Sequence, residues 1–176
     1  MLFRSGGVLL PNGNVVFCPF NATNIGIFNP NTNSFTTFSG VDAAYLGGVL
    51  TSVGTVVFVP YNTTTVLGFF NWQTNTYTTI GISVVNNAFA GGVLLPNGQV
   101  LFIPAVATYF GVFNPFSNAF TTYAIGAPGN YAFQGGNLLP DGRIVFAPQN
   151  ATTVGILSRG PPTPPEFCMH PCFNKF

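Results

Sequence analysis

The residues that could do chemistry are few, and three of them lie together near the C-terminus. Cys168 and Cys172 flank His170, the only histidine in the chain. Two thiols and one imidazole supply at most three ligands at a poor spacing, whereas a structural zinc site normally takes four. We therefore predict no metal and no cofactor. Cys168 and Cys172 are candidates for a local disulfide, and free or intermolecular thiols are an equal alternative.

Charged residues are just as sparse, with four Lys or Arg and three Asp or Glu among 176 residues. They make up 4% of the chain, against about 25% in an ordinary soluble domain. Nucleic-acid binding requires a basic patch, and the sequence has none. Hydrolysis by paired carboxylates requires two acids in one cleft, and Asp42, Asp141 and Glu166 lie far apart in the sequence. We therefore predict that the protein is not an enzyme and does not bind nucleic acid.

The apolar composition excludes a disordered chain. The sequence is 47% hydrophobic with a mean hydropathy of +0.43, whereas disordered chains are apolar-poor and charge-rich. A membrane span needs about 18 or more consecutive apolar residues, and Pro, Asn, Gly or Thr interrupts every apolar stretch earlier. The first residues lack the apolar segment and cleavage site of a secretory signal. We expect one folded domain without a membrane span.

An internal repeat organises most of the sequence. Glycine pairs recur at spacings of 41, 44 and 44 residues, beginning at Gly6, Gly47, Gly91 and Gly135. Each pair opens the text GGVLLPNGNVVFCP or a close variant. A second block such as IGIFNPNTNSFTTF (25–38) follows in three copies, and the fourth copy stops early at VGIL (154–157). Repeats of this length are typical of propellers and related arrays.

Each full repeat predicts four short β-strands. Val, Ile, Phe, Tyr and Thr dominate the apolar segments, as expected for half-buried strands. The Asn-Gly or Asp-Gly pairs after Pro11, Pro96 and Pro140 favour tight hairpin turns. No helical periodicity is present. Four antiparallel strands in 40 to 50 residues are typical of a propeller blade.

These motifs resemble the kelch repeat of galactose-oxidase-type propellers. Kelch repeats carry a diglycine, an aromatic-Asp-Pro turn and then Thr-Asn-Thr-Trp; here Asn29, Asn71 and Asn114 stand at the Asp position. The resemblance covers roughly residues 3–157 and implies an all-β, propeller-like fold of four-stranded blades. It does not bring the copper oxidase activity, which needs two histidine ligands. A weaker resemblance links the Asn/Thr-rich repeats to structural proteins of large viruses and phages.

The fourth repeat lacks one strand. The sequence therefore divides into a repeat domain over 1–157 and a Pro-rich tail over 158–176. The chain could close alone with a strand from either terminus, form half of a ring closed by a second chain, or form an open array. We favour a homo-oligomer or filament that pairs through the unfinished edge. The tail aromatics dock on a neighbouring subunit or pack on their own domain: Phe167, Phe173 and Phe176.

Three Asn-x-Thr sequences occupy the same position in their repeats. They begin at Asn21, Asn62 and Asn150, each 15 residues after the first glycine of the repeat. They are candidates for N-glycosylation. The alternative is that Asn and Thr are simply favourable turn residues copied with the repeat.

The composition predicts a role in assembly. A nearly uncharged Asn/Thr-rich surface gives little repulsion against association. We predict a non-enzymatic structural protein of an extracellular fibre or virion surface. The alternative is a carbohydrate-binding module in which Trp72, Tyr61, Tyr109 and Tyr123 stack on sugars, although core or turn packing is the favoured explanation of these aromatic residues.

Overall fold

The computed structural model describes residues 4–42, 44–125, 130–159 and 167–169. All regular elements in this part of the chain are β-strands. Their bounds are β1 (Arg4–Leu9), β2 (Val15–Pro19), β3 (Asn24–Asn29), β4 (Ser34–Ser39), β5 (Tyr45–Leu50), β6 (Thr55–Pro60), β7 (Val66–Asn71), β8 (Thr76–Gly81), β9 (Phe89–Leu94), β10 (Val100–Pro104), β11 (Tyr109–Asn114), β12 (Ala119–Ala124), β13 (Phe133–Leu138), β14 (Ile144–Pro148), β15 (Gly155–Arg159) and β16 (Phe167–Met169).

The strands form four antiparallel sheets of four strands, each built from consecutive strands. We call them blade 1 (β1–β4), blade 2 (β5–β8), blade 3 (β9–β12) and blade 4 (β13–β16). The predicted all-β, propeller-like architecture is therefore confirmed, with one blade per repeat.

The predicted turns join the first strand to the second and the third strand to the fourth in the blades. In blade 1, the Gly13 amide donates to the Leu10 carbonyl at 2.9 Å, and Gly13 has a φ of 84° that favours glycine. Blades 3 and 4 repeat this hydrogen bond at Gly98 and Gly142. The following hairpin turns begin with an asparagine whose side chain accepts a backbone amide, as Asn29 does from Asn31 at 2.9 Å.

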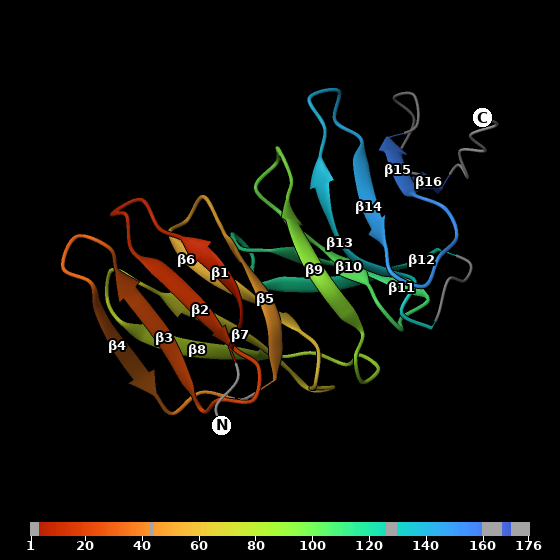
Figure 1. The fold of residues 1–176 in the computed structure, drawn as a ribbon. Coiled ribbons are helices and arrows are strands. Elements are labelled where there is room, and N and C mark those ends of the chain that lie inside the picture. Colours follow the sequence, from red (N-terminus) through yellow and green to blue (C-terminus); the bar gives the residue numbers. More distant parts are fainter. Residues whose placement is uncertain (1–3, 43, 126–129, 160–166, 170–176) are drawn as a thin grey trace.

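The blades are arranged in an arc, with blade 1 and blade 4 at its two ends (Figure 1). Their first strands pack against one another in the order β1, β5, β9 and β13. Blades 2 and 3 are buried on both faces because each has a neighbouring blade on either side. Successive side chains of a strand point to opposite sides of the sheet, so each strand contributes to both interfaces. In β6, Val56 and Phe58 pack toward blade 1, whereas Val57 and Val59 pack toward blade 3.

The core is therefore three separate layers between blades. One apolar cluster lies between blades 1 and 2, a second between blades 2 and 3, and a third between blades 3 and 4. In the described residues, no helix is long and apolar enough to cross a membrane.

The chain itself supplies the fourth strand of blade 4. β15 extends to Arg159, and β16 pairs with it through Leu157↔Met169, Ser158↔Cys168 and Arg159↔Phe167. The expectation that the edge of β15 stays unpaired and recruits a neighbour is therefore wrong. The alternative in which a strand from a chain terminus completes the blade is the one that the structure shows. The sequence did not favour it because a Pro-rich stretch separates this strand from the repeat and its three residues do not follow the repeat pattern.

Candidate functional site

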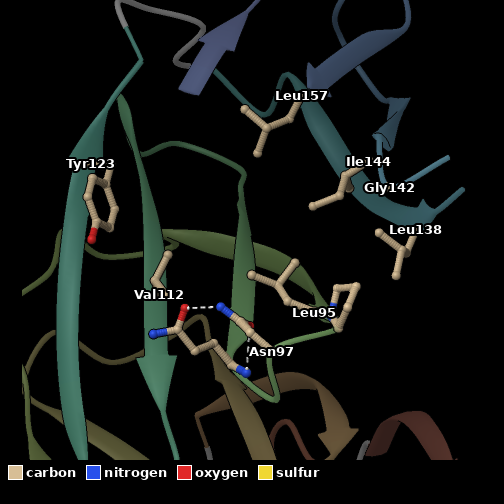
Figure 2. A pocket seen from close by; sticks show the side chains of 10 residues that line it. Leu95, Asn97, Val112, Tyr123, Leu138, Gly142, Ile144 and Leu157 are labelled. Atoms are coloured by element: carbon tan, nitrogen blue, oxygen red, sulfur yellow. Dashed lines mark hydrogen bonds between the residues drawn. The ribbon is translucent and has the colours of Figure 1, made fainter. Parts of the chain in front are cut away.

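A cavity of about 370 Å³ lies between blades 3 and 4 (Figure 2). Blade 3 contributes residues from the β9–β10 turn and from β11 and β12, and blade 4 contributes residues from the β13–β14 hairpin and from β15. The lining residues are Leu95, Pro96, Asn97, Gln99, Val112, Tyr123, Leu138, Gly142, Ile144 and Leu157. The cavity therefore opens at the blade edge that carries the Pro-Asn-Gly and Pro-Asp-Gly turns.

Aromatic side chains fill the space between the other blades, although they come from different repeat positions. Between blades 1 and 2, the rings of Phe38 and Phe70 pack with centroids 5.5 Å apart. Between blades 2 and 3, the rings of Phe69 and Phe113 pack at 4.8 Å. Both contacts belong to the buried clusters of their interfaces.

Smaller side chains stand at the positions of Phe69 and Phe113 between blades 3 and 4. Aligning the repeats on their strand registers places Val112 where blade 2 has Phe69, and Leu157 where blades 2 and 3 have Phe70 and Phe113. Figure 2 shows Val112 and Leu157 on opposite sides of the open space. Compared with the interface between blades 2 and 3, this layer lacks two rings, and smaller side chains in a close-packed layer leave a void.

The opposite end of the same interface is well packed. Phe110 and Phe146 lie with ring centroids 5.3 Å apart, and both are buried. The corresponding residues between blades 1 and 2 are Ile25 and Phe58. Phe146 stands where blades 2 and 3 have Phe58 and Phe102, so this interface gains one ring, that of Phe110, at the end opposite the cavity.

A pair of amides forms the polar part of the cavity wall. The Asn97 side-chain nitrogen donates to the Gln99 side-chain oxygen at 2.8 Å, and the Gln99 backbone amide donates to the Asn97 oxygen at 3.1 Å (Figure 2). These bonds fix both side chains on the turn between β9 and β10. Their position next to Leu95 gives an otherwise apolar cavity one hydrogen-bonding edge.

The only charged pair near the cavity is exposed, among the residues that the structure describes. Arg143 and Asp141 form an ion pair of 2.7 Å in the β13–β14 turn beside Gly142. The hydrogen bond from the Arg143 side chain lowers the pKa of Asp141. Such exposed pairs add little stability, so this pair shapes the turn rather than the electrostatics of the cavity.

A polar chain at the blade 1–2 interface was not predicted from the sequence. The Tyr45 and Tyr77 hydroxyls lie 2.8 Å apart, and the Tyr77 hydroxyl donates to the Asp42 carboxylate at 3.0 Å. Burial is the main cause that raises the pKa of Tyr77 to about 12 and raises that of Tyr45. The two tyrosines and Asp42 come from different repeat positions, so no single motif points to them.

The three glycosylation candidates lie on equivalent turns. Asn21, Asn62 and Asn150 are exposed in the β2–β3, β6–β7 and β14–β15 connections, at the opposite strand ends from the cavity. The Asn150 side chain donates to the Asn130 carbonyl at 3.0 Å. Glycan attachment at these three residues stays a prediction.

The tail and cysteine predictions fall largely outside the described residues. Phe167 and Cys168 lie in β16, whereas Cys172, Phe173 and Phe176 lie outside the described part of the chain. Their docking and disulfide roles stay predictions. Within the described residues, no group of three His, Cys, Asp or Glu side chains is placed to hold a metal ion.

The aromatic residues considered for sugar stacking do not form one platform. Trp72 packs against the cluster between blades 1 and 2, and Tyr61 packs on Phe20 with centroids 5.8 Å apart. The hydroxyl of Tyr109 accepts the Val85 backbone amide at 2.9 Å. Only Tyr123 of the four lines the cavity.

Comparison with known proteins places the fold but not the family. No protein-family model and no curated protein matches the chain. Virginiamycin B lyase from Staphylococcus aureus is similar over 96% of this chain and 55% of its own, at 16% identity and a TM-score of 0.76. A proposed 6-phosphogluconolactonase from Bacteroides uniformis is similar over 96% and 54%, at 14% identity and a TM-score of 0.72. The RRP9 WD40 repeats are similar over 89% and 48%, at 11% identity and a TM-score of 0.68.

These similarities show a β-propeller-type fold, and the chain spans about half the length of the structures it matches. The predicted structural role in an extracellular fibre or virion surface is contradicted, because the similar structures are enzymes and WD40 repeats. That prediction rested on surface composition and on an unpaired strand edge, and β16 pairs that edge. The kelch assignment stays an interpretation of the motifs.

Proposed function

We propose that the protein is a ligand-binding module that takes one small, neutral aromatic molecule into the cavity between blades 3 and 4. The observation that carries the proposal is that Val112 and Leu157 stand between blades 3 and 4 at the positions where Phe69 and Phe113 fill the interface between blades 2 and 3. The vacated volume of about 370 Å³ lies within the range of ligand pockets, roughly 300–1,000 Å³.

The shape and chemistry of the wall favour an aromatic ligand. The two filled interfaces show that this position between blades accepts flat rings packed against Leu, Ile and Val side chains. A neutral ring gains from leaving water, whereas a charged group would lose its hydration without a partner of opposite charge. The described lining offers only amides and a phenol for polar contact, from Asn97, Gln99 and Tyr123.

The ligand is therefore a bicyclic or substituted monocyclic ring with one hydrogen-bonding edge. Its ring replaces the missing side chains, and its polar edge faces the Asn97–Gln99 pair. The chemistry of the described wall is desolvation and hydrogen bonding, which supports binding as the activity of this site.

Indole is a suitable probe because it combines a flat bicyclic ring with one N–H donor. Titration calorimetry with indole should give one site per chain, with a dissociation constant on the order of 0.1–1 mM. Leu157→Phe should weaken binding at least about tenfold, because the new ring occupies the cavity as Phe70 and Phe113 do in their interfaces.

Val85→Phe is the matched control. It adds a similar ring at an exposed position between blades 2 and 3 and should leave indole binding unchanged. Equal binding by wild type and Leu157→Phe, with both variants folded, would exclude the cavity as the site.

A further inference from the structure

The two ends of the arc present the two halves of one blade interface. We call the face of a blade that is turned toward the next blade in the sequence its forward face, and the opposite face its rear face. Every internal interface joins the forward face of one blade to the rear face of the next. Blade 1 has no described blade against its rear face, and blade 4 has none against its forward face (Figure 1).

The rear face of blade 1 carries the residues that are buried in blades 2, 3 and 4. Phe17 takes the place of the fully buried Phe58, and Val15 takes the place of the fully buried Val56. Leu9 is 68% exposed, although the equivalent Leu50 packs into the blade 1–2 cluster. This face is apolar and belongs against another sheet.

The forward face of blade 4 is built for the same contact. Val145 and Ala147 take the places of Val57 and Val59 in blade 2, which are buried against blade 3. Val154 is 45% exposed, whereas Leu67 at the equivalent position is fully buried. Small and branched apolar side chains are thus repeated on this face without the covering blade.

The second glycine of each pair in the first strand of a blade shows how closely the preceding blade packs there. A side chain at Gly48 would lie 3.0 Å from Cys18 and 3.1 Å from Val8, because blade 1 fills that slot. At Gly7, the equivalent position in blade 1, the near atoms all come from Val15 and Phe17 of the same blade. The slot on blade 1 therefore stands open toward the missing neighbour. In blade 4, Ala147 and Asn137 stand at the positions of Cys18 and Val8.

We infer that a second copy of this chain closes the arc, with blade 4 of each copy packed on blade 1 of the other. Two four-bladed arcs joined in this way make a closed ring of eight blades, within the range of about four to eight known for propellers. The contact is between different faces, but two copies related by a two-fold axis satisfy all four faces.

Light scattering coupled to size exclusion at micromolar concentration should give a species of twice 18.6 kDa. Leu9→Asp and Val154→Asp should each give monomers, with dimer affinity reduced roughly 100-fold or more, because a carboxylate buried without a partner opposes the contact. Both positions are largely exposed in the single chain, so both variants should keep the β-rich circular dichroism spectrum and a cooperative melt.

Mixing the two monomeric variants tests the arrangement of the faces. The mixture contains one pair of unaltered faces, blade 1 of Val154→Asp and blade 4 of Leu9→Asp, and should therefore recover part of the dimer. Phe116→Asp, an exposed residue on a turn of blade 3, is the control that should remain dimeric. A monomeric wild type, a larger assembly, or a mixture that stays monomeric would each overturn the two-copy ring.

Discussion

The interface between blades 2 and 3 and the interface between blades 3 and 4 are built from the same repeat positions and packed differently. The first places Phe69 against Phe113 at 4.8 Å and has no room between them. The second has Val112 and Leu157 at those positions and encloses about 370 Å³. One smaller side chain in each of two repeats thus converts a structural contact into a candidate binding site without altering the strands.

The comparison also shows why repetition helps to locate function. In a fold without repeats, no equivalent interface in the same molecule shows which side chains would normally fill a cavity. Here the filled interfaces supply that reference, and the departure at Val112 and Leu157 stands out against them. The polar Asn97–Gln99 pair at the same place reinforces the departure.

The largest effect is expected from removing a buried ring from the interface between blades 2 and 3. Phe113→Ala should lower the free energy of unfolding by about 3–5 kcal/mol, because it removes a fully buried ring and leaves a void. Urea unfolding followed by circular dichroism measures this. Phe116→Ala removes an exposed ring on the same blade and should change stability by no more than about 0.5 kcal/mol. A small loss for Phe113→Ala would mean that the rings do not support the interface.

The blade 1–2 interface should be sensitive to alkali. Burial raises the pKa of the Cys18 thiol from 9.0 to about 12. The folded protein therefore holds this proton more tightly than the unfolded chain, so the contribution to stability is complete below pH 9 and is lost between about pH 9 and 12. Between pH 7 and 11, Cys18→Ala should lose about 2–3 kcal/mol less stability than wild type.

Urea unfolding of wild type and Cys18→Ala at both pH values gives this difference directly. The packing cost of the substitution cancels because each protein is compared with itself. If wild type and Cys18→Ala lost the same free energy of unfolding between the two pH values, the pKa of the thiol would not differ between the folded and the unfolded chain.

The closeness of neighbouring blades can be tested at a glycine. A side-chain carbon at Gly92 would lie 2.7 Å from Val49 of the preceding blade. Gly92→Ala should therefore destabilise the protein by about 1–3 kcal/mol. Gly81→Ala is the control, since no atom lies within 4 Å of the added carbon, and it should be neutral or slightly stabilising. Similar melting temperatures for both variants would contradict the tight contact.

The smallest effect is expected from filling the cavity. Leu157→Phe should stabilise the protein by about 0.5–2 kcal/mol, because the ring occupies empty apolar space. Thermal melts of wild type and variant measure the gain. A destabilised Leu157→Phe would show that the space is too small for a ring and would weaken the case for a ligand.

Most of the fold could be predicted from the sequence, because each structural feature is copied with the repeat. The glycine pairs, the Asn-Gly turns and the alternating apolar residues each specify local geometry, and four copies make them visible. A strand from the C-terminal tail was one of the alternatives for completing the fourth blade, but its residues could not be predicted, since Phe167–Met169 has no counterpart in the other repeats and its pairing depends on tertiary contact.

The candidate site was missed for a different reason. Val112 and Leu157 are ordinary strand residues, and only the structure shows which positions face each other across two blades. The repeat alignment contained the difference from Phe69 and Phe113, but a smaller apolar residue in a strand does not indicate a cavity by itself. The extracellular location predicted from the low charge stays a prediction.

Methyl NMR during an indole titration tests the central claim most directly, because it locates the bound ring. We predict chemical-shift changes concentrated on methyl groups that line the cavity, those of Leu95, Val112, Leu138, Ile144 and Leu157. The methyl groups of Val56 and Val57 in the filled interfaces should not respond. Shifts spread over exposed residues such as Val85, or no saturable shift at the five cavity residues, would contradict the account.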